Sequence, residues 1–264
     1  MEHNKIIHRE FSKQASRFED KGLTLSNQDI LDWSVSLLPQ DKEFQVLDVA
    51  AGTGHLSRAI APHVRGVIAI DITPKMLDYA REERARSKLT NISIEEGEAE
   101  YLPHKSDCFD LVVSRLAIHH FEKPIVQLRE MVRVCKPGHR IAVIDLIAPE
   151  NKRLAGIYNR LERLRDPSHT LALSKKQMAK LLSDAGIVIE TVEIRNIEVD
   201  FQRWVQMTET KPETIEILRE ELLKDLNDGS KTGMRPFMKH GDLKFLQVWS
   251  VIIGMKYLKA KYSY

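Results

Sequence analysis

The chain has 264 residues, 42% of them hydrophobic, and its 40 basic and 38 acidic side chains leave a formal net charge of +2. This length and composition allow a sizeable core in one α/β domain, with insertions or a small cap. The near balance of charge calls for no polyanionic partner, so nucleic acid is not expected. Two cysteines, a polar N-terminus and no apolar run approaching roughly 20 residues predict a cytoplasmic protein without membrane association.

The first half of the chain alternates between strands and helices. Residues 1–40 are expected to form two amphipathic helices, at about 6–18 and 29–38, the second ended by Pro39. Short apolar runs then alternate with helical segments, a pattern typical of parallel strands joined by right-handed crossovers. The expected strands are 44–49, 66–70, 92–95, 109–114 and 140–147, and the expected helices are 55–61, 75–88 and 125–135.

The second half is predicted to complete the sheet and to add a cap. Helices are expected at 151–165 and 174–184, a half-buried strand at 187–199, a polar helical stretch at 200–240 and a final strand at 244–255. A strand, an insertion and a returning strand suggest an antiparallel edge. We therefore predict an α/β fold with a doubly wound, mostly parallel seven-stranded sheet. Residues 1–40 are assigned to lid helices, 41–150 to the core, and 151–264 to the end of the sheet with cap insertions at about 151–173 and 200–240.

The strongest motif is residues 46–57, VLDVAAGTGHLS, in which a buried strand runs into a turn of small residues followed by a helix. Ligands of open α/β sheets bind beyond the carboxyl ends of the strands. Gly52 and Gly54 have no Cβ, so the backbone can turn tightly and approach a ligand closely. An ordinary tight turn is the alternative interpretation of these two glycines alone.

Two acidic positions strengthen the interpretation as a nucleoside site. Asp71 follows the second strand, close to the roughly 20-residue spacing at which an acid accepts hydrogen bonds from both ribose hydroxyls; a helix-capping role is the alternative. Residues 97–103, GEAEYLP, follow the third strand, and an acid there could accept from an adenine amino group.

These segments resemble class I S-adenosylmethionine-dependent methyltransferases, especially those similar to the ubiquinone/menaquinone-biosynthesis enzymes. The resemblance covers about residues 44–148 in register, and its segments are weak singly but highly specific in this order. They are residues 47–54 (LDVAAGTG), 71–77 (DITPKML), 97–103 (GEAEYLP), 109–112 (FDLV), 119–121 (HHF) and 134–138 (VCKPG).

The resemblance implies a Rossmann-like methyltransferase fold that binds S-adenosylmethionine, and it implies roles for individual residues. Asp48 and the loop containing Ala50, Gly52 and Gly54 would hold the methionine moiety, with Arg115 beside it. Asp71 would bind the ribose, Ile72 and Met76 would flank the adenine, and Glu98 and Ala99 would contact its edge. Residues 11–18, which end at Phe18, resemble a lid helix that closes over the cofactor. The implied site residues are Phe18, Asp48, Ala50, Gly52, Gly54, Asp71, Ile72, Met76, Glu98, Ala99 and Arg115.

Two positions depart from the usual pattern of such enzymes. Ala50 stands where glycine is most frequent, which is expected to narrow the turn slightly. Glu98 replaces the more usual aspartate, so the adenine contact is expected to shift by one methylene. The C-terminal third matches only in general plan, and substrate residues cannot be carried over to it.

Methyl transfer by in-line displacement needs a general base only if the nucleophile loses a proton. The candidates are His119, His120 and His169, because histidine titrates near neutrality. One of the adjacent pair is expected to be structural, since neighbouring side chains at a strand end point in different directions. The aromatic residues Phe201, Trp204 and Phe237 either line an apolar acceptor pocket or anchor the cap. The spacing of the His, Cys and acidic residues indicates no metal site.

Three alternatives remain open at this point. A nicotinamide-dependent dehydrogenase would need glycine where Ser57 stands. An amino-methylating nucleic-acid enzyme would usually carry an aromatic base-stacking motif where residues 114–117 read SRLA. A non-catalytic S-adenosylmethionine-binding protein would share the cofactor motifs. We favour methyl transfer to a small-molecule acceptor; the oligomeric state and the acceptor atom cannot be read from the sequence.

Overall fold

Eight strands form one sheet in the computed structural model, which describes residues 2–20, 22–229 and 231–257. The strands are β1 (Gln45–Val49), β2 (Gly66–Asp71), β3 (Ile92–Glu96), β4 (Phe109–Arg115), β5 (Cys135–Ile147), β6 (Ile187–Asp200), β7 (Phe237–Lys239) and β8 (Asp242–Lys256). Their order is β3-β2-β1-β4-β5-β8-β6, with β7 paired to β8. Strands β1 to β5 are parallel, whereas β8 runs antiparallel to both β5 and β6. The mostly parallel sheet is therefore confirmed.

The predicted count of seven strands was one too few, because the stretch 200–240 is not helical throughout. Strand β7 forms a hairpin with β8 through His240 and Gly241. Both residues have positive φ, 53° and 88°, as a two-residue type I′ turn requires. Strand β5 also begins earlier than predicted: Cys135 pairs with Phe109 before a register shift.

Helices cover both faces of the sheet. They are α1 (Glu2–Gln14), α2 (Gln28–Leu37), α3 (His55–Ile60), α4 (Pro74–Ser87), α5 (Pro124–Val134), α6 (Lys152–Arg165), α7 (Lys175–Asp184), α8 (Phe201–Met207) and α9 (Pro212–Asp228), with 3₁₀ turns η1 (Ala15–Arg17), η2 (Ala61–His63) and η3 (Ile118–His120). One apolar cluster joins the sheet to α5 and α7, and another joins it to α2 and α3. The fold is thus doubly wound, as predicted. None of the described helices is both long and apolar enough to cross a membrane.

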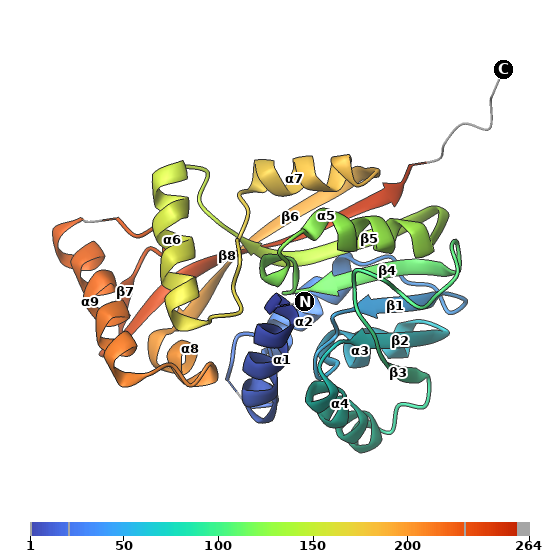
Figure 1. The fold of residues 1–264 in the computed structure, drawn as a ribbon, viewed down its shortest axis with the longest axis horizontal. Coiled ribbons are helices and arrows are strands. Elements are labelled where there is room, and N and C mark those ends of the chain that lie inside the picture. The colour runs from blue at the N-terminus through green and yellow to red at the C-terminus, as the bar shows by residue number, and fades with distance from the viewer. Residues whose placement is uncertain (1, 21, 230, 258–264) are drawn as a thin grey trace.

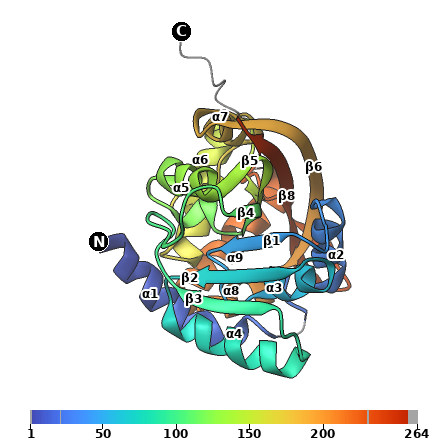
Figure 2. The ribbon, with the colours of Figure 1, turned by 90° about the vertical axis from the view of Figure 1, so that its right-hand side faces the viewer.

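A third apolar cluster builds the cap. Tyr158 of α6, Trp204 of α8 and Leu218 of α9 pack with Phe245 of β8. Helices α6, α8 and α9 gather at one end of the molecule around the long strands β6 and β8 (Figure 1). The view in Figure 2 places α1 beyond the carboxyl ends of β1 and β2, beside α4. The carboxyl edge of the sheet is therefore enclosed between the N-terminal helix and the cap.

Candidate active site

A cavity of about 470 Å³ lies at the carboxyl edge of the sheet, between α1 and the cap. Most residues singled out from the sequence line it: Phe18, Asp48, Ala50, Gly52, Asp71, Ile72, Ala99, Arg115, His119 and His120. Four of the predicted cofactor-binding and base residues lie outside its lining, as do the aromatic residues Phe201 and Phe237. Gly54 caps α3, Met76 is buried in α4, Glu98 is exposed, and His169 is buried behind the other histidines.

The loop after β1 takes its shape from left-handed backbone conformations. Ala50, Gly52 and Gly54 have φ of 56°, 57° and 82°. Glycine adopts this region freely, but an L residue such as Ala50 is strained there. The left-handed φ therefore adds backbone strain at Ala50, and the expected narrowing of the turn stays a prediction. The ring of Phe18 lies 3.7 Å from where a Cβ on Gly52 would stand, so the lid residue covers this loop.

Asp48 at the end of β1 is a buried carboxylate with one oxygen unpaired. Ser57 Oγ donates to its Oδ2 at 2.6 Å, but Oδ1 has no hydrogen-bond partner among the described residues. Ser57 occupies the position where a dinucleotide motif has its third glycine, and here it orients the acid. Burial raises the pKa of Asp48 to about 7. A buried acceptor without a donor is costly, and its position at a cavity wall points to a ligand donor.

Arg115 supplies a positive charge on the same cavity wall. Its guanidinium lies over the ring of Trp249, 5.4 Å from the centroid, and donates from Nη2 to the Leu25 carbonyl at 2.9 Å. The Nε atom has no hydrogen-bond partner among residues 2–20, 22–229 and 231–257. Burial lowers the pKa of Arg115 to about 10, with Asp48 opposing the shift. The Asp48 carboxyl group and the Arg115 guanidinium thus share the wall of the cavity, and each has one polar atom without a hydrogen-bond partner among the described residues.

Asp71 at the end of β2 fastens the glycine loop. Its Oδ2 accepts from the backbone N–H of Gly52 and its Oδ1 from that of Thr73, both at 2.8 Å. Burial raises its pKa despite these bonds. Each carboxylate oxygen has a second lone pair, so Asp71 can hold the loop and still accept from a ligand hydroxyl.

His119 is oriented by a carboxylate that lies behind it. Asp145 of β5 is fully buried, and its Oδ1 is 2.5 Å from His119 Nδ1. The backbone N–H groups of His119 and Leu146 also donate to this carboxylate. Asp145 acts as an acceptor in these contacts, so the ring proton belongs on Nδ1. The Nε2 atom makes no hydrogen bond to a described residue, as in Asp–His pairs that orient a catalytic base.

His120 is held by a longer chain of hydrogen bonds. Ser168 Oγ donates its one proton to Asp166 Oδ1 at 2.5 Å, so it must accept from His120 Nδ1 at 3.1 Å. Burial alone would raise the pKa of Asp166. The charges of Arg165 and His120 have the larger combined effect and hold the pKa of Asp166 below its ordinary value. Burial and the neighbouring His119 lower the pKa of His120 to about 3. His120 is therefore neutral near pH 7.

His169, the third candidate base, lies beside His119 and His120 and has a structural role. His169 lies 5.4 Å from His119 between ring centroids, and its Nε2 is 2.7 Å from Asn159 Oδ1. Asn159 donates from its amide nitrogen to two backbone carbonyls, so its oxygen is the acceptor. Burial lowers the pKa of His169. Its ring therefore ties the 166–173 loop to α6.

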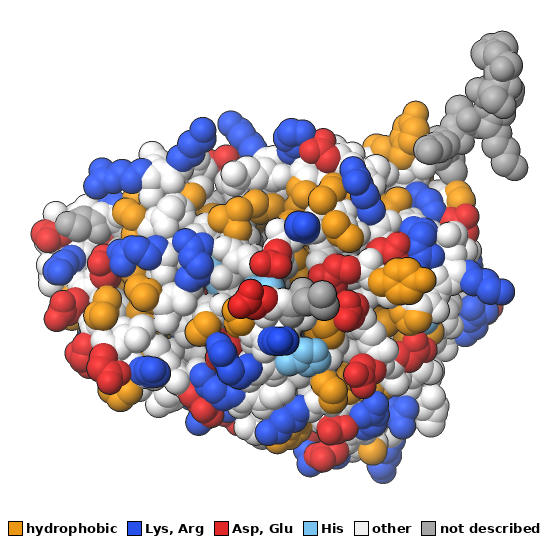
Figure 3. Space-filling model, viewed as in Figure 1, with side chains coloured by type: hydrophobic (Ala, Val, Ile, Leu, Met, Phe, Trp, Pro, Cys, Tyr) orange, Lys and Arg blue, Asp and Glu red, His pale blue; other side chains and the backbone are white. Residues whose placement is uncertain are grey.

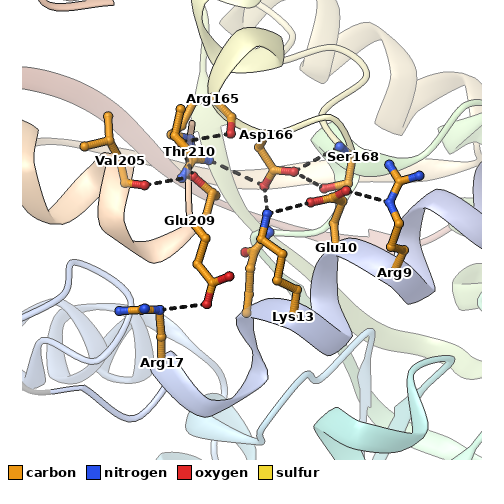
Figure 4. Close-up of polar contacts among 12 residues, drawn as sticks. Arg9, Glu10, Lys13, Arg17, Arg165, Asp166, Ser168, Val205, Glu209 and Thr210 are labelled. Atoms are coloured by element: carbon orange, nitrogen blue, oxygen red, sulfur yellow. Dashed lines mark hydrogen bonds and ion pairs between the residues drawn. The ribbon is translucent and has the colours of Figure 1, made fainter. Parts of the chain in front are cut away.

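Polar contacts fasten the N-terminal segment to Asp166 and Glu209 (Figure 4). Gln14 Nε2 donates to Asp166 Oδ2 at 3.5 Å, and Arg17 pairs with Glu209 at 3.3 Å. Phe11, on the same helix as Gln14, lines the cavity. Helix α1 and the loop that orients His120 thus share the Asp166 carboxylate.

Sequence reasoning missed Asp145, Asp166 and Ser168. Asp145 carried a usable signal, since it is the one charged residue within the apolar run 141–147. Asp166 and Ser168 precede His169 in the sequence, and only the structure shows that they orient His120 instead. Within the described residues, no three His, Cys, Asp or Glu side chains are grouped to hold a metal ion.

A doubly wound sheet with β8 antiparallel between β5 and β6, and a glycine loop between acids on β1 and β2, is the architecture of class I methyltransferases. Residues 40–211 match the family described as the methyltransferase domain. The chain belongs to this family and is a methyltransferase.

Individual relatives agree with this assignment. The uncharacterized methyltransferase YcgJ of Bacillus subtilis strain 168 is 31% identical over 196 residues, covering 74% of this chain and 77% of the relative. The crystal structure of YcgJ matches with a TM-score of 0.81 at 26% identity, covering 88% of this chain and 100% of that one. The crystal structure of a putative methyltransferase of Bacillus halodurans C-125, BH2331, matches with a TM-score of 0.80 at 27% identity, covering 87% of this chain and 100% of that one. The ubiquinone/menaquinone biosynthesis C-methyltransferase UbiE of Pectobacterium carotovorum strain PC1 is 35% identical over 119 residues, 44% of this chain and 47% of that one.

Proposed function

We propose that this protein transfers a methyl group from S-adenosylmethionine to a small-molecule acceptor by in-line displacement. The observation that carries the proposal is a pair of buried atoms on one cavity wall, Asp48 Oδ1 and Arg115 Nε, neither of which has a hydrogen-bond partner among the described residues. The methionine part of the cofactor carries an ammonium and a carboxylate, which complement these two groups. The residues present therefore fit this cofactor.

The nucleoside would lie along the ends of β2 and β3. Asp71 would accept from the ribose hydroxyls, and Ile72 would pack on the adenine, since both line the cavity. At the adenine edge, Glu98 points to solvent while Ala99 and Glu100 line the cavity, so we transfer the expected acidic contact to Glu100. Gln127 Nε2 donates to Glu100 Oε1 at 2.7 Å and orients it. Met76 would support the adenine pocket from behind.

When bound, S-adenosylmethionine supplies a methyl group on a sulfonium, whose sulfur keeps the bonding electron pair as the acceptor bonds to the methyl. The chain's own residues would hold the partners in line, which is worth about 7–11 kcal/mol. Phe18 and α1 would exclude water from the site. For an acceptor that must lose a proton, His119 Nε2 would take it while Asp145 stabilises the imidazolium, a contribution of about 10²–10⁴-fold.

The acceptor side of the cavity favours a partly apolar or aromatic small molecule. Leu146, Trp204 and Trp249 line it. On the face that Figure 3 shows, basic and acidic side chains are interspersed, which does not favour a phosphate-tracking nucleic-acid interface there. The name of UbiE, a C-methyltransferase of quinone biosynthesis, supports a small acceptor. The free Cys108 and Cys135 fit the reducing cytoplasm, where we place the protein.

Calorimetric titration tests the proposal. We expect micromolar binding of S-adenosylmethionine and of S-adenosylhomocysteine, no binding of NADH, and weaker binding of both cofactors by Asp48→Asn. Release of S-adenosylhomocysteine would then be followed with a panel of phenolic, quinol and amine acceptors. Binding of NADH alone would favour a dehydrogenase, whereas cofactor binding without turnover on any acceptor would favour a non-catalytic binding protein.

A further inference from the structure

A second arginine–tryptophan stack lines the cavity on its acceptor side. Arg165 ends α6, and its Cζ lies 5.1 Å from the centroid of the Trp204 ring in α8. Trp204 in turn meets Phe245 edge-on at 5.0 Å. Both members of the stack line the same cavity as His119 and His120. The cap therefore presents a fixed polar group next to the candidate bases.

Each member of this stack has a buried donor that is not used. Trp204 is only 6% exposed, yet its Nε1 has no hydrogen-bond partner in the part of the chain that the structure describes. Arg165 Nε has a Glu162 carboxylate oxygen 3.4 Å away but makes no hydrogen bond. Trp249, the other tryptophan of the cavity, does donate, to Gln247 at 3.2 Å. The unused indole N–H therefore distinguishes the Arg165–Trp204 stack from the Arg115–Trp249 stack, and both unused donors of the former call for an acceptor atom.

The charges around Arg165 decide which kind of acceptor fits. Glu162 lies 3.4 Å and Asp166 3.7 Å from its guanidinium, and both carboxylates are buried. The single positive charge is thus already more than balanced. A further anion would meet net negative surroundings at low dielectric, whereas a neutral oxygen with free lone pairs would not.

The stack is also joined to the histidines through a short chain of contacts. Asp166 follows Arg165 in the sequence, and it accepts from Ser168, which accepts from His120. Because Trp204, Arg165 and His120 line one cavity, an oxygen fixed at Trp204 and Arg165 leaves the rest of a small acceptor in the space that the histidines also line.

We infer that Trp204 Nε1 and Arg165 Nε form an acceptor subsite that binds a neutral carbonyl oxygen of the substrate, so the substrate is an aromatic or apolar carbonyl compound. The inference deepens the proposed methyl transfer and rests on it for the identity of the ligand as the substrate. Binding of the carbonyl group itself can be measured without turnover.

The test is nuclear magnetic resonance on ¹⁵N-labelled protein, whose three tryptophans give three indole N–H signals. Acetophenone is the probe, ethylbenzene is its match without oxygen, and benzoate is its anionic match. We expect acetophenone to move the Trp204 indole proton downfield and ethylbenzene to leave it nearly in place. Trp204→Phe should lower acetophenone affinity about five-fold, as the loss of one neutral hydrogen bond implies, with ethylbenzene affinity unchanged. Arg165→Lys should lower it similarly, and Arg160→Lys, on the exposed face of α6, should not.

Several results would overturn the inference: no response to acetophenone, an equal response to ethylbenzene, tighter binding of benzoate, or full acetophenone affinity in Trp204→Phe. Calorimetry with S-adenosylhomocysteine on the same samples separates this result from the proposed function. A Trp204 response without cofactor binding would refute the methyl-transfer proposal and keep the carbonyl subsite. Cofactor binding without the response would refute the subsite alone.

Discussion

His119 Nδ1 lies 2.5 Å from Oδ1 of Asp145, so a ring at the cavity wall is held by a fully buried carboxylate. Because this contact leaves Nε2 free, we expect His119→Gln to lower kcat about 10²–10⁴-fold for an acceptor that loses a proton. Cofactor affinity by calorimetry should change little. The matched control is His169→Gln, 5.4 Å away and outside the cavity lining, which should lose stability but stay within a few-fold of normal turnover. Equal loss in both variants would show that the cluster is purely structural.

Asp145→Asn should reduce kcat while leaving the KM for the acceptor and the affinity for S-adenosylhomocysteine nearly unchanged. An amide can present its N–H to Nδ1 and shift the ring proton to Nε2, which removes the base without moving the ring. Steady-state kinetics separates the two parameters. A rise in KM with kcat intact would mean that Asp145 shapes the acceptor pocket and does not set the tautomer.

The raised pKa of Asp48 leads us to expect that stability falls with rising pH while cofactor affinity rises. Its pKa is raised from 3.8 to about 7 by burial, so the folded protein holds this proton more tightly than the unfolded chain does. Its contribution to stability is complete below about pH 4 and is lost as the pH rises through about 7. The cofactor ammonium needs the charged carboxylate, so affinity should rise with pH, by up to about ten-fold per unit below pH 7.

The measurement pairs thermal unfolding of the free protein with titration of S-adenosylhomocysteine between pH 5.5 and 7.5. Asp48→Asn should flatten both profiles. Wild-type affinity that is independent of pH over this range would remove Asp48 as the ammonium partner.

Asp71→Asn separates the loop role of this acid from its proposed ribose contact. An amide has one acceptor oxygen, so either Gly52 or Thr73 loses its partner, at a cost of about 1–3 kcal/mol in the free energy of unfolding. Affinity should fall for S-adenosylhomocysteine but not for L-methionine, which has no ribose. Equal losses for both ligands would show that Asp71 acts only through the loop.

The parts of the site that were predictable from sequence are those formed by neighbours in the chain. Asp48, Gly52 and Asp71 lie at a strand end, a turn and the next strand end, so strand and turn patterns place them at one edge of the sheet. Glu98 and Glu100 show the limit of such reasoning: Tyr101 N–H donates to the Glu98 carbonyl in a turn, and that turn leaves Glu98 exposed and Glu100 at the cavity. The sequence pattern alone does not determine which of these two glutamates faces the cavity.

The partners of the histidines depend on contacts between distant segments. Asp145 is 26 residues from His119, and Ser168 is 48 residues from His120. Which acid pairs with which ring follows from the packing of β5 and of the 166–173 loop against η3, and no local periodicity encodes it. The same holds for Trp204 and Arg165, which meet only because α8 returns to α6.

Ala50 offers a test of whether the glycine loop stores strain. Its φ of 56° costs an L residue about 1–2 kcal/mol, whereas glycine adds about 0.5–1 kcal/mol of unfolded-chain entropy. Ala50→Gly should therefore leave the free energy of unfolding unchanged or raise it by up to about 1.5 kcal/mol, measured by urea denaturation. The matched control is Ala59→Gly within α3, which has helical backbone and should lose about 1 kcal/mol. If both variants lost the same stability, the left-handed conformation at Ala50 would carry no strain. Strain released by glycine would mean that alanine holds the loop in its left-handed turn at a cost to stability, with Asp71 anchoring the amide of Gly52 two residues further on.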